Sequence, residues 1–304
     1  MVFKVNILGC GSATPTLQRN PTAQVINILE RHFLIDCAEG TQLQMRKYGI
    51  KFQKINHIFI SHLHGDHYLG LVGFISTLHL LGRTKDLHIY GPEALGEIIF
   101  TQLKASSSYL SYHIEFHPLN SKKSELIFED KLVTVRTIPL KHRIYCNGFL
   151  IEEKQHPYRL DIKSAESNEI PIAWYHRLKA GGDYIENGVH IPNSQLTFTP
   201  YPSRSYAYCS DTAYFESIIP IIKKAHLLYH EATFLEIHKK RAKQTLHSTA
   251  KQAASIAEQA EVKQLILGHY SARYKKTSDF VNEAKTIFNN TSAVEDGDVY
   301  NITF

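Results

Sequence analysis

The sequence lacks paired cysteines, long apolar runs and the pattern of a secretion signal. Its four cysteines are scattered and form no CxxC pair, so we expect neither a disulfide framework nor a thiolate zinc site. No run of about 18 apolar residues occurs, which leaves no candidate for a membrane-spanning helix. The start, MVFKVNILGCG, has no basic segment followed by a long apolar one. These absences predict a protein of the reducing cytoplasm without a membrane partner.

The composition is that of an ordinary globular protein, with 43% hydrophobic and 21% charged residues. The formal net charge is +5 at pH 7, a mildly basic balance that permits a polyanionic partner without requiring one. Histidine is unusually frequent, with 18 in 304 residues, and the positions of these histidines indicate the chemistry.

Strands alternate with helices along most of the chain. Strands are expected at 3–7, 24–29, 32–36, 57–61, 87–90, 205–210, 227–230 and 264–268, and helices at 39–48 and 68–80. The second and third strands are expected to form a hairpin that turns at Glu30-Arg31, and Gly91-Pro92 is expected to open the helix after the strand 87–90. Thr249 and Gln252 fit a capping box at the start of a further helix. This order predicts an α/β fold in which helices lie outside two facing sheets, a four-layer sandwich formed by residues 1–304 as one domain.

The segment 152–192 differs from the rest because it is polar, contains prolines and glycines, and shows little periodicity. A long insert without regular structure inside a compact domain is usually functional or mobile. We therefore expect an inserted flexible arm at 152–192.

The strongest chemical pattern is HLHGDH at 62–67. His62 and His64, two residues apart just after a strand, can present imidazoles to one cation, and Gly65 allows a tight turn. Asp66 and His67 then point elsewhere, where a second cation would use them. The alternative, a solvated polar loop, does not explain why four of the six residues are of ligand type.

Three more ligand-type residues, His142, Asp211 and His269, each follow an apolar strand. Loops beyond strand ends are where sites are built on α/β sheets. We therefore predict two Zn²⁺ ions that share a water and are bridged by Asp211. The first is held by His62, His64 and His142, and the second by Asp66, His67 and His269. Two zinc ions about 3.5–4 Å apart suit phosphodiester cleavage, although manganese or iron fits the same nitrogen and oxygen ligands.

His247 and Glu231 are the candidates for proton transfer. A leaving 3′-oxygen needs a proton, and an imidazole is the natural donor near neutral pH. We assign this role to His247, with Glu231 holding it, while a supporting carboxylate remains the alternative for Glu231. Asp66 is expected to orient or deprotonate the attacking water as well as bind metal. Basic residues beside the site predict a phosphate-tracking surface: Lys141, Arg143, Lys239, Lys240, Arg241, Lys243, Arg273, Lys275 and Lys276.

These residues resemble those of the ribonuclease Z family, the tRNA 3′-processing endonucleases of the metallo-β-lactamase superfamily. HLHGDH is common to the superfamily. More specific are LGCGSATPTLQRNPTA, FLIDCAEGTQLQM, SDT at 210–212, HEATF at 230–234, HSTA at 247–250 and GHYSARY at 268–274.

The resemblance implies a homodimer that hydrolyses precursor tRNA after the discriminator nucleotide, leaving a 3′-hydroxyl on the tRNA and a 5′-phosphate on the trailer. It implies the same seven zinc ligands and the same proton-transfer pair. It also places Arg19, Asn20, Ser248 and Thr249 near the tRNA end, where we add Arg273 as an RNA contact. The arm stands where the family carries its tRNA-binding exosite, but it reads IPIAWYHRLKAGG in place of the family's Gly-Pro motif.

Two other functions remain open on the sequence. The first is a hydrolase of the same fold that acts on a small phosphodiester or a lactone, although such a substrate needs neither the arm nor the basic clusters. The second is an RNA-binding module without catalysis, which the complete set of seven ligand-type residues disfavours.

Overall fold

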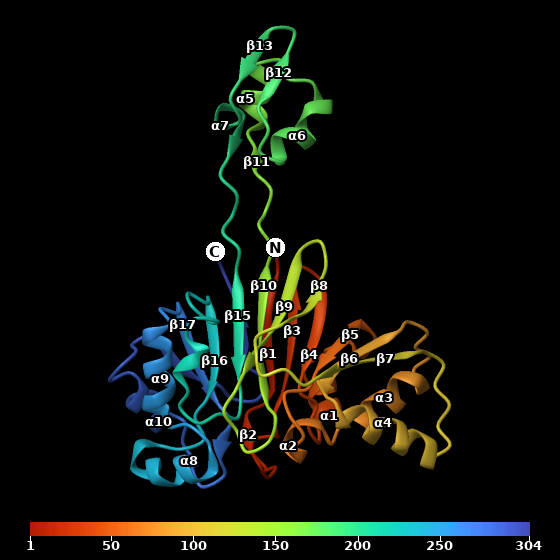
Figure 1. Cartoon of the computed structure of the whole chain (residues 1–304), viewed down its shortest axis with the longest axis vertical. Helices are drawn as coiled ribbons and strands as arrows, with labels where there is room; N and C mark the ends of the chain where they lie inside the picture. Colours follow the sequence, from red (N-terminus) through yellow and green to blue (C-terminus); the bar gives the residue numbers. More distant parts are fainter.

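Two seven-stranded sheets face each other, with helices on both outer sides (Figure 1). The structure, a computed structural model, describes residues 1–304. The first sheet has the order β20 (Val299–Asn301), β1 (Phe3–Gly9), β3 (Ala23–Ile28), β4 (Arg31–Ile35), β5 (Ile55–Phe59), β6 (Leu87–Pro92) and β7 (Ile114–Leu119). The second has the order β19 (Thr291–Ala293), β17 (Gln264–Gly268), β16 (Leu227–Glu231), β15 (Ser205–Cys209), β10 (Asn147–Glu153), β9 (Val133–Pro139) and β8 (Leu126–Glu129).

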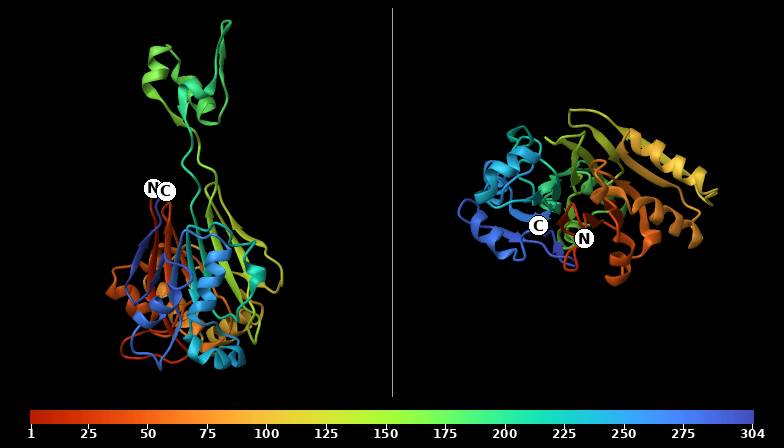
Figure 2. Two further views of the ribbon diagram at one scale, coloured as in Figure 1. Left: turned by 90° about the vertical axis from the view of Figure 1, so that its left-hand side faces the viewer. Right: turned by 90° about the horizontal axis from the view of Figure 1, so that it is seen from below.

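The helices form the two outer layers, which the view from below in Figure 2 separates clearly. Helices α1 (Thr41–Lys47), α3 (Leu71–Leu80) and α4 (Ala94–Ala105) share a buried apolar cluster with the first sheet. Helices α9 (Ala250–Gln259) and α10 (Ser278–Ala284) share the larger cluster with the second sheet, and α8 (Lys239–Thr245) lies at the bottom of Figure 1. The predicted four-layer α/β sandwich is confirmed.

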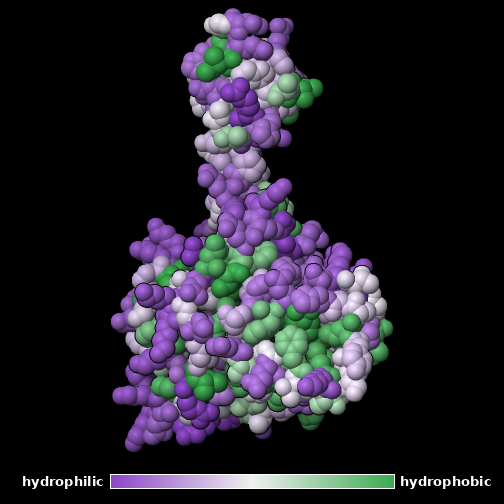
Figure 3. All heavy atoms as spheres, turned by 45° about the vertical axis from the view of Figure 1, so that its right-hand side comes forward, coloured by the Kyte–Doolittle hydropathy of each residue, from purple (hydrophilic) through white to green (hydrophobic).

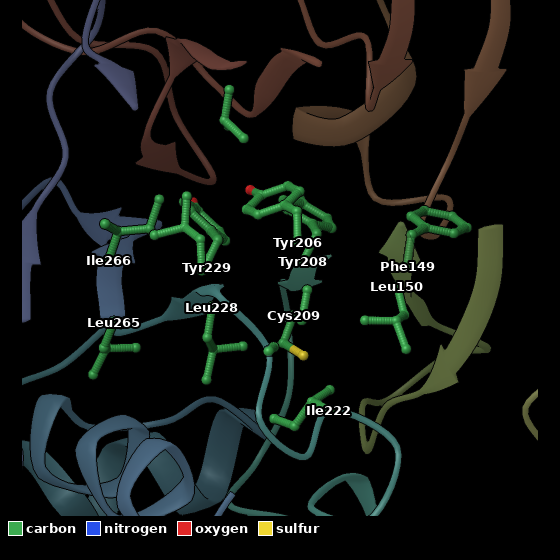
Figure 4. Packing of buried hydrophobic residues seen from close by; sticks show 14 of the residues in the cluster. Phe149, Leu150, Tyr206, Tyr208, Cys209, Ile222, Leu228, Tyr229, Leu265 and Ile266 are labelled. Atoms are coloured by element: carbon green, nitrogen blue, oxygen red, sulfur yellow. The ribbon is translucent and has the colours of Figure 1, made fainter. Parts of the chain in front are cut away.

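Strands β15, β16 and β17 of the second sheet are buried on both faces, which explains their continuous apolar runs. In Figure 4, Phe149, Tyr208 and Tyr229 point toward the first sheet, while Leu228 and Leu265 point toward the helices. Strands β15, β16 and β17 run parallel, so their carboxyl ends meet at one edge. That edge carries the candidate site.

One local expectation is confirmed and two need correction. The capping box of Thr249 and Gln252 is formed at the start of α9. The hairpin between β3 and β4 turns at Leu29 and Glu30, which have φ of 49° and 65°, one residue before the predicted turn. Pro92 was expected to open a helix but still pairs in β6, and α4 begins at Ala94.

The insert is a folded arm on a two-stranded stalk (Figure 1), and the space-filling view of Figure 3 shows it standing above the body on a narrower neck. It contains β11 (Arg159–Leu160), α5 (Ile162–Ser167), α6 (Tyr175–Lys179), β12 (Tyr184–Glu186), β13 (Val189–Ile191), α7 (Asn193–Leu196) and β14 (Thr197–Phe198), with one 3₁₀ turn at Ile172–Trp174. Five buried residues form its own small core: Ala165, Ile170, Leu178, Tyr184 and Leu196. The expectation of an arm without regular structure was wrong, because elements this short show no helical or strand period. The arm also starts later and ends later than 152–192, since Glu153 still pairs in β10 and the chain re-enters the sheet at Ser205.

The base of the arm is fixed to the body by a buried ion pair. Arg204 contacts both carboxylate oxygens of Glu153, with 2.9 Å between Nε and Oε2, and His156 Nε2 lies 3.1 Å from the same oxygen. Arg204 also donates to the carbonyls of Met1 and Ile302, so that both ends of the chain meet at the stalk, as Figure 2 shows. None of the helices has both the length and the apolar character that a membrane span requires.

Candidate metal centre

The predicted ligands converge at the end of the body opposite the arm (Figure 1). HLHGDH follows β5 and enters the short helix α2 (Gly65–Tyr68). His142 follows β9, Asp211 follows β15 and His269 follows β17. The first sheet therefore supplies four of the seven ligand-type residues and the second sheet three, and the site lies where the two sheets meet.

The first group consists of three histidines and one oxygen of Asp211. His64 Nδ1 lies 3.0 Å from His62 Nε2 and 3.2 Å from His142 Nε2. Asp211 Oδ2 lies 3.6 Å from His62 Nε2 and 3.7 Å from His142 Nε2. These four ligand atoms point at one common position.

The second group uses the other oxygen of the same carboxylate. Asp211 Oδ1 lies 3.2 Å from His67 Nε2 and 3.1 Å from His269 Nε2. Asp66 Oδ2 lies 3.6 Å from each of these two nitrogens. Asp211 thus faces both groups at once, which is the bridging position expected from the sequence.

The donor chemistry fits a pair of divalent cations. The Nε2 atoms of His67 and His269 are buried without a hydrogen-bond partner, and a buried polar atom left in this way costs free energy unless something binds there. Burial lowers the pKa of His62 well below its ordinary value, which favours the neutral imidazole that binds metal. Burial alone would raise the pKa of Asp211, but His269, His67 and His62 hold it well below its ordinary value, so this carboxylate is ionised.

Hydrogen bonds at the ring nitrogens that face away from the ligand groups fix the orientation of the imidazoles. Asp36 Oδ2 lies 2.8 Å from His67 Nδ1 and accepts hydrogen bonds from Tyr208 and Ser61. Such contacts set which ring nitrogen is free to bind metal. Sequence reasoning missed Asp36, although it lies in FLIDCAEGT at the end of a buried strand, the same placement that singled out the other ligands.

His142 and His269 are held in the same way. His142 Nδ1 lies 3.1 Å from the carbonyl of Leu246, and His269 Nδ1 lies 2.9 Å from Thr233 Oγ1. Thr233 was also missed, although it lies within HEATF. Only its contact with His269, 36 residues away, reveals its role.

Glu231 and His247 form a pair beside the two groups. Glu231 Oε1 lies 2.7 Å from His247 Nδ1, and its two oxygens also accept from the backbone of Thr212 and Thr233. Burial would lower the pKa of His247, but the neighbouring carboxylate of Glu231 raises it to about 9. His247 therefore carries a proton at neutral pH, with Nε2 4.0 Å from Asp211 Oδ2.

The five predicted RNA contacts differ in whether their side chains are buried within the protein or lie at its surface. Arg19 is turned inward and 7% exposed. Its guanidinium bonds Glu295 and the carbonyls of Tyr274 and Lys275, so it braces its loop against the loop after β18 (Tyr270–Ser271). Asn20 bonds Asp296.

Ser248 and Thr249 are fully buried. The hydroxyl of Ser248 donates to the carbonyl of Thr212, and that of Thr249 caps α9 and donates to Glu236. Arg273 alone among the five lies at the surface, with its guanidinium over the ring of Phe234. The sequence could not distinguish inward from outward side chains within these loops.

A cavity of about 670 Å³ opens in front of the two groups, with His64, Asp66, Asp211 and His247 in its wall. Arg143 and Arg241 also line it, and Arg143 lies 3.1 Å from His64 Nε2. An adjoining cavity of about 750 Å³ is lined by Lys122, Lys123 and Lys141, among others. Cationic side chains at the opening favour an anionic substrate.

A sandwich of two sheets with a paired histidine and aspartate centre at its edge defines a metal-dependent hydrolase of the metallo-β-lactamase fold. The solved metallo-β-lactamase fold protein YhfI from Bacillus subtilis matches with a TM-score of 0.71 at 19% identity and covers 99% of this chain and 100% of that one. The human short-form tRNase Z matches with a TM-score of 0.73 at 27% identity, over 99% of this chain and 100% of that chain.

Sequence comparison gives the particular family. A curated relative named ribonuclease Z from Bacteroides thetaiotaomicron is 50% identical over 95% of this chain and 92% of its own length. Another of that name, from Porphyromonas gingivalis, is 48% identical over 97% of both chains. A family model described as "Anti-Pycsar protein Apyc1" matches residues 3–171. The chain belongs to the ribonuclease Z family, and over residues 3–171 to the family that the Apyc1 model describes.

Proposed function

We propose that this protein is a zinc-dependent endoribonuclease that removes the 3′ trailer from precursor tRNA after the discriminator nucleotide. The observation that carries the proposal is one carboxylate, Asp211, shared between two ligand groups, with an imidazole–carboxylate pair beside it. The relatives named ribonuclease Z and the human tRNase Z support the assignment of substrate. The cationic cavity wall supports it as well, because RNA must be bound through its phosphates.

Two Zn²⁺ ions per subunit would be held by the two groups, with Asp211 between them. When bound, such a pair polarises the phosphate and makes a nearby water more acidic. His62, His64 and His142 would hold one ion, and Asp66, His67 and His269 the other. Asp36 and Thr233 would keep the Nε2 atoms of His67 and His269, respectively, directed at the second ion.

Side chains of the protein itself carry out the remaining steps. Asp66, whose pKa is held low by His67 and His269 despite burial, orients the attacking water and accepts the proton that this water loses. The oxygen of that water bonds to phosphorus while the bond to the 3′-oxygen of the tRNA breaks. His247 donates its proton to the leaving 3′-oxygen, and Glu231 stabilises the charged imidazole before transfer.

The five predicted RNA contacts divide into two roles. Arg19, Asn20, Ser248 and Thr249 shape the loops around the cavity, since their polar groups are bonded within the protein. Arg273 contacts the RNA. The arm serves as a second tRNA-binding surface at the far end of the body. The enzyme acts as a homodimer in the cytoplasm, a location supported by four free, buried cysteines.

Cleavage of a defined precursor tRNA tests the activity. Purified protein with Zn²⁺ should release the trailer with one cut after the discriminator nucleotide, leaving a 3′-hydroxyl. His64→Ala should abolish the cut, while His113→Ala, a matched change at an exposed histidine away from the site, should leave it intact. Trimming by His64→Ala at the normal rate would refute the metal-dependent mechanism. If the protein binds tRNA equally well with and without zinc, and no zinc concentration produces a cut, the protein is a binding module instead.

Removal of the arm separates tRNA cleavage from hydrolysis of a small phosphodiester. Residues 158–201 are replaced by a short Gly-Ser linker, which keeps Glu153, His156 and Arg204 at the base. Precursor tRNA cleavage should collapse, while bis(p-nitrophenyl) phosphate turnover should stay. Unchanged tRNA cleavage would contradict the role of the arm. Light scattering of the intact protein tests the proposed dimer directly.

A further inference from the structure

A second cluster of ligand-type side chains lies on the first sheet, outside the candidate metal centre. Glu115 of β7 pairs in register with His88 of β6, and His117 pairs with Tyr90. His57 of β5 pairs with His88 on the other side. Because alternate residues of a strand face the same side, all of these side chains project from one face of the sheet.

The ligand atoms of three of them converge. His88 Nδ1 lies 3.1 Å from His117 Nε2 and 3.2 Å from Glu115 Oε2. His117 Nε2 lies 3.8 Å from Glu115 Oε1. These separations match those within the first group of the candidate centre, where the corresponding atoms lie 3.0–3.7 Å apart.

Stacking holds the two imidazoles in place. The ring of His117 lies on Tyr90 with centroids 4.2 Å apart and planes 8° apart. The ring of His88 lies on His57 at 4.8 Å and 17°. Rings already fixed in this way lose little conformational freedom when they bind a ligand, which favours affinity.

The cluster is open to solvent and distant from the catalytic edge. The side chains of His88, His117 and Glu115 are 28%, 31% and 51% exposed, respectively, so an ion can enter and keep a water as a further ligand. His57 precedes His62 by five positions, roughly 16 Å along an extended chain. The cluster therefore cannot share an ion with the two groups beyond β5.

We propose that His88, Glu115 and His117 form a third divalent-cation site that tethers β7, the edge strand of the first sheet, to β6. Two imidazoles and one carboxylate select a transition ion such as Zn²⁺, Co²⁺ or Ni²⁺ over Mg²⁺ or Ca²⁺. The site binds its ion independently of the catalytic pair. It leaves cleavage unchanged, since none of its residues lines the cavity in front of the ligand groups.

Zinc counting under buffered free Zn²⁺ tests this site. The intact protein is dialysed to equilibrium and its zinc content is measured by mass spectrometry. The double variant His88→Ala/His117→Ala should bind one Zn²⁺ fewer per chain than the intact protein, with unchanged precursor tRNA cleavage. The matched control His113→Ala, at the exposed residue just before β7 and outside the cluster, should lose no zinc.

Two further measurements distinguish loss of the third site from misfolding of the variant and from failure of the proposed catalytic centre. Glu115→Gln keeps the shape and should also lose one equivalent. A catalytic-centre variant, His64→Ala/His142→Ala, should still bind Co²⁺, and adding His88→Ala/His117→Ala should lower its visible absorption by the band of one bound ion. Equal zinc content in the intact protein and the double variant, or a Co²⁺ spectrum that this addition does not change, would overturn the third site.

Discussion

At the scale of single residues, the chemistry of the candidate centre depends on side chains that would touch neither metal nor substrate. Asp36 is buried and accepts from His67, Tyr208 and Ser61 at one oxygen, and from the backbone N–H of Ser61 at the other. Every one of these partners is positioned to donate. An amide at this position would therefore turn an N–H toward another donor, and the orientation of His67 would change.

We predict that Asp36→Asn weakens zinc binding by about 10–100-fold, as loss of an outer contact to a metal-binding histidine commonly does. Competition with a chromophoric chelator measures this change. Tyr208→Phe is the matched control, because it removes only one donor to Asp36 and should have a much smaller effect. Identical zinc affinity in Asp36→Asn and the parent protein would show that Asp36 does not orient His67.

His247 can be tested as the proton donor through the leaving group. His247→Ala should lower kcat for precursor tRNA by about 10²–10⁴-fold. A substrate with sulfur in place of the 3′-oxygen at the cut needs no proton on the leaving atom, and with it most of the loss should disappear. Glu231→Gln should follow the same pattern, since Glu231 stabilises the protonated imidazole. A defect of equal size on both substrates would contradict proton donation by His247.

At the scale of elements, the arm is a small folded unit whose core has five buried residues. Leu178 is fully buried there, and truncation of a buried leucine to alanine costs about 2–5 kcal/mol. We expect Leu178→Ala to lower the hydrogen-exchange protection of residues 160–198 while β15 to β17 keep theirs. The KM for precursor tRNA should rise and turnover of a small phosphodiester should not change.

Ile185→Ala is the control for the arm, since Ile185 is 62% exposed on β12 and its truncation leaves the small core intact. If Leu178→Ala lowered protection equally in the arm and in the body, the two would not be separate folding units.

The contrast between arm and body shows what a sequence pattern can reveal. Strands such as β15 and β16 were predicted because burial on both faces demands continuous apolar runs. The arm elements are two to six residues long, too short to display a period. The site shows the same limit. The seven ligand-type residues could be predicted because each lies just after a predicted strand. The inward orientation of Arg19 could not be predicted, because it depends on Glu295, 276 positions away in the sequence.

The ion pair at the base of the arm should make stability depend on pH. Burial would raise the pKa of Glu153, but hydrogen bonds from Arg204 and His156 hold it below the ordinary value of 4.5. A carboxyl with a lowered pKa in the folded state contributes its full stability above 4.5 and loses it as the pH falls through the folded pKa. Glu153→Gln should therefore be less stable than the parent at neutral pH, because Arg204 is left buried without a counter-charge.

Urea denaturation across the pH range measures this effect. The difference between Glu153→Gln and the parent should shrink as the pH falls below 4.5. Glu152→Gln, one residue earlier in β10 and without that ion pair, is the control. A difference that stays constant with pH would mean that the charge of Glu153 does not stabilise the arm base.

At the scale of the whole molecule, the candidate centre joins the two sheets. The ligand-type residues of HLHGDH belong to the first sheet, and His142, Asp211 and His269 belong to the second. No covalent bond other than the backbone links the sheets, since all four cysteines are free. Ions bound at this edge would therefore stabilise the sandwich as a whole, because they bind the folded state and not the unfolded chain.

Global stability should consequently rise with free Zn²⁺. Each site adds about 2.7 kcal/mol when free zinc is 100 times its dissociation constant, so the urea midpoint should increase across a zinc titration and fall after chelation. The measurement is made in the His88→Ala/His117→Ala background, so that zinc bound at the edge of the first sheet does not contribute. Asp211→Ala in that background should lose most of the zinc dependence, because both groups lose their shared carboxylate. If the parent midpoint did not change with zinc while zinc-dependent cleavage persisted, the ions would serve catalysis without joining the two halves of the fold.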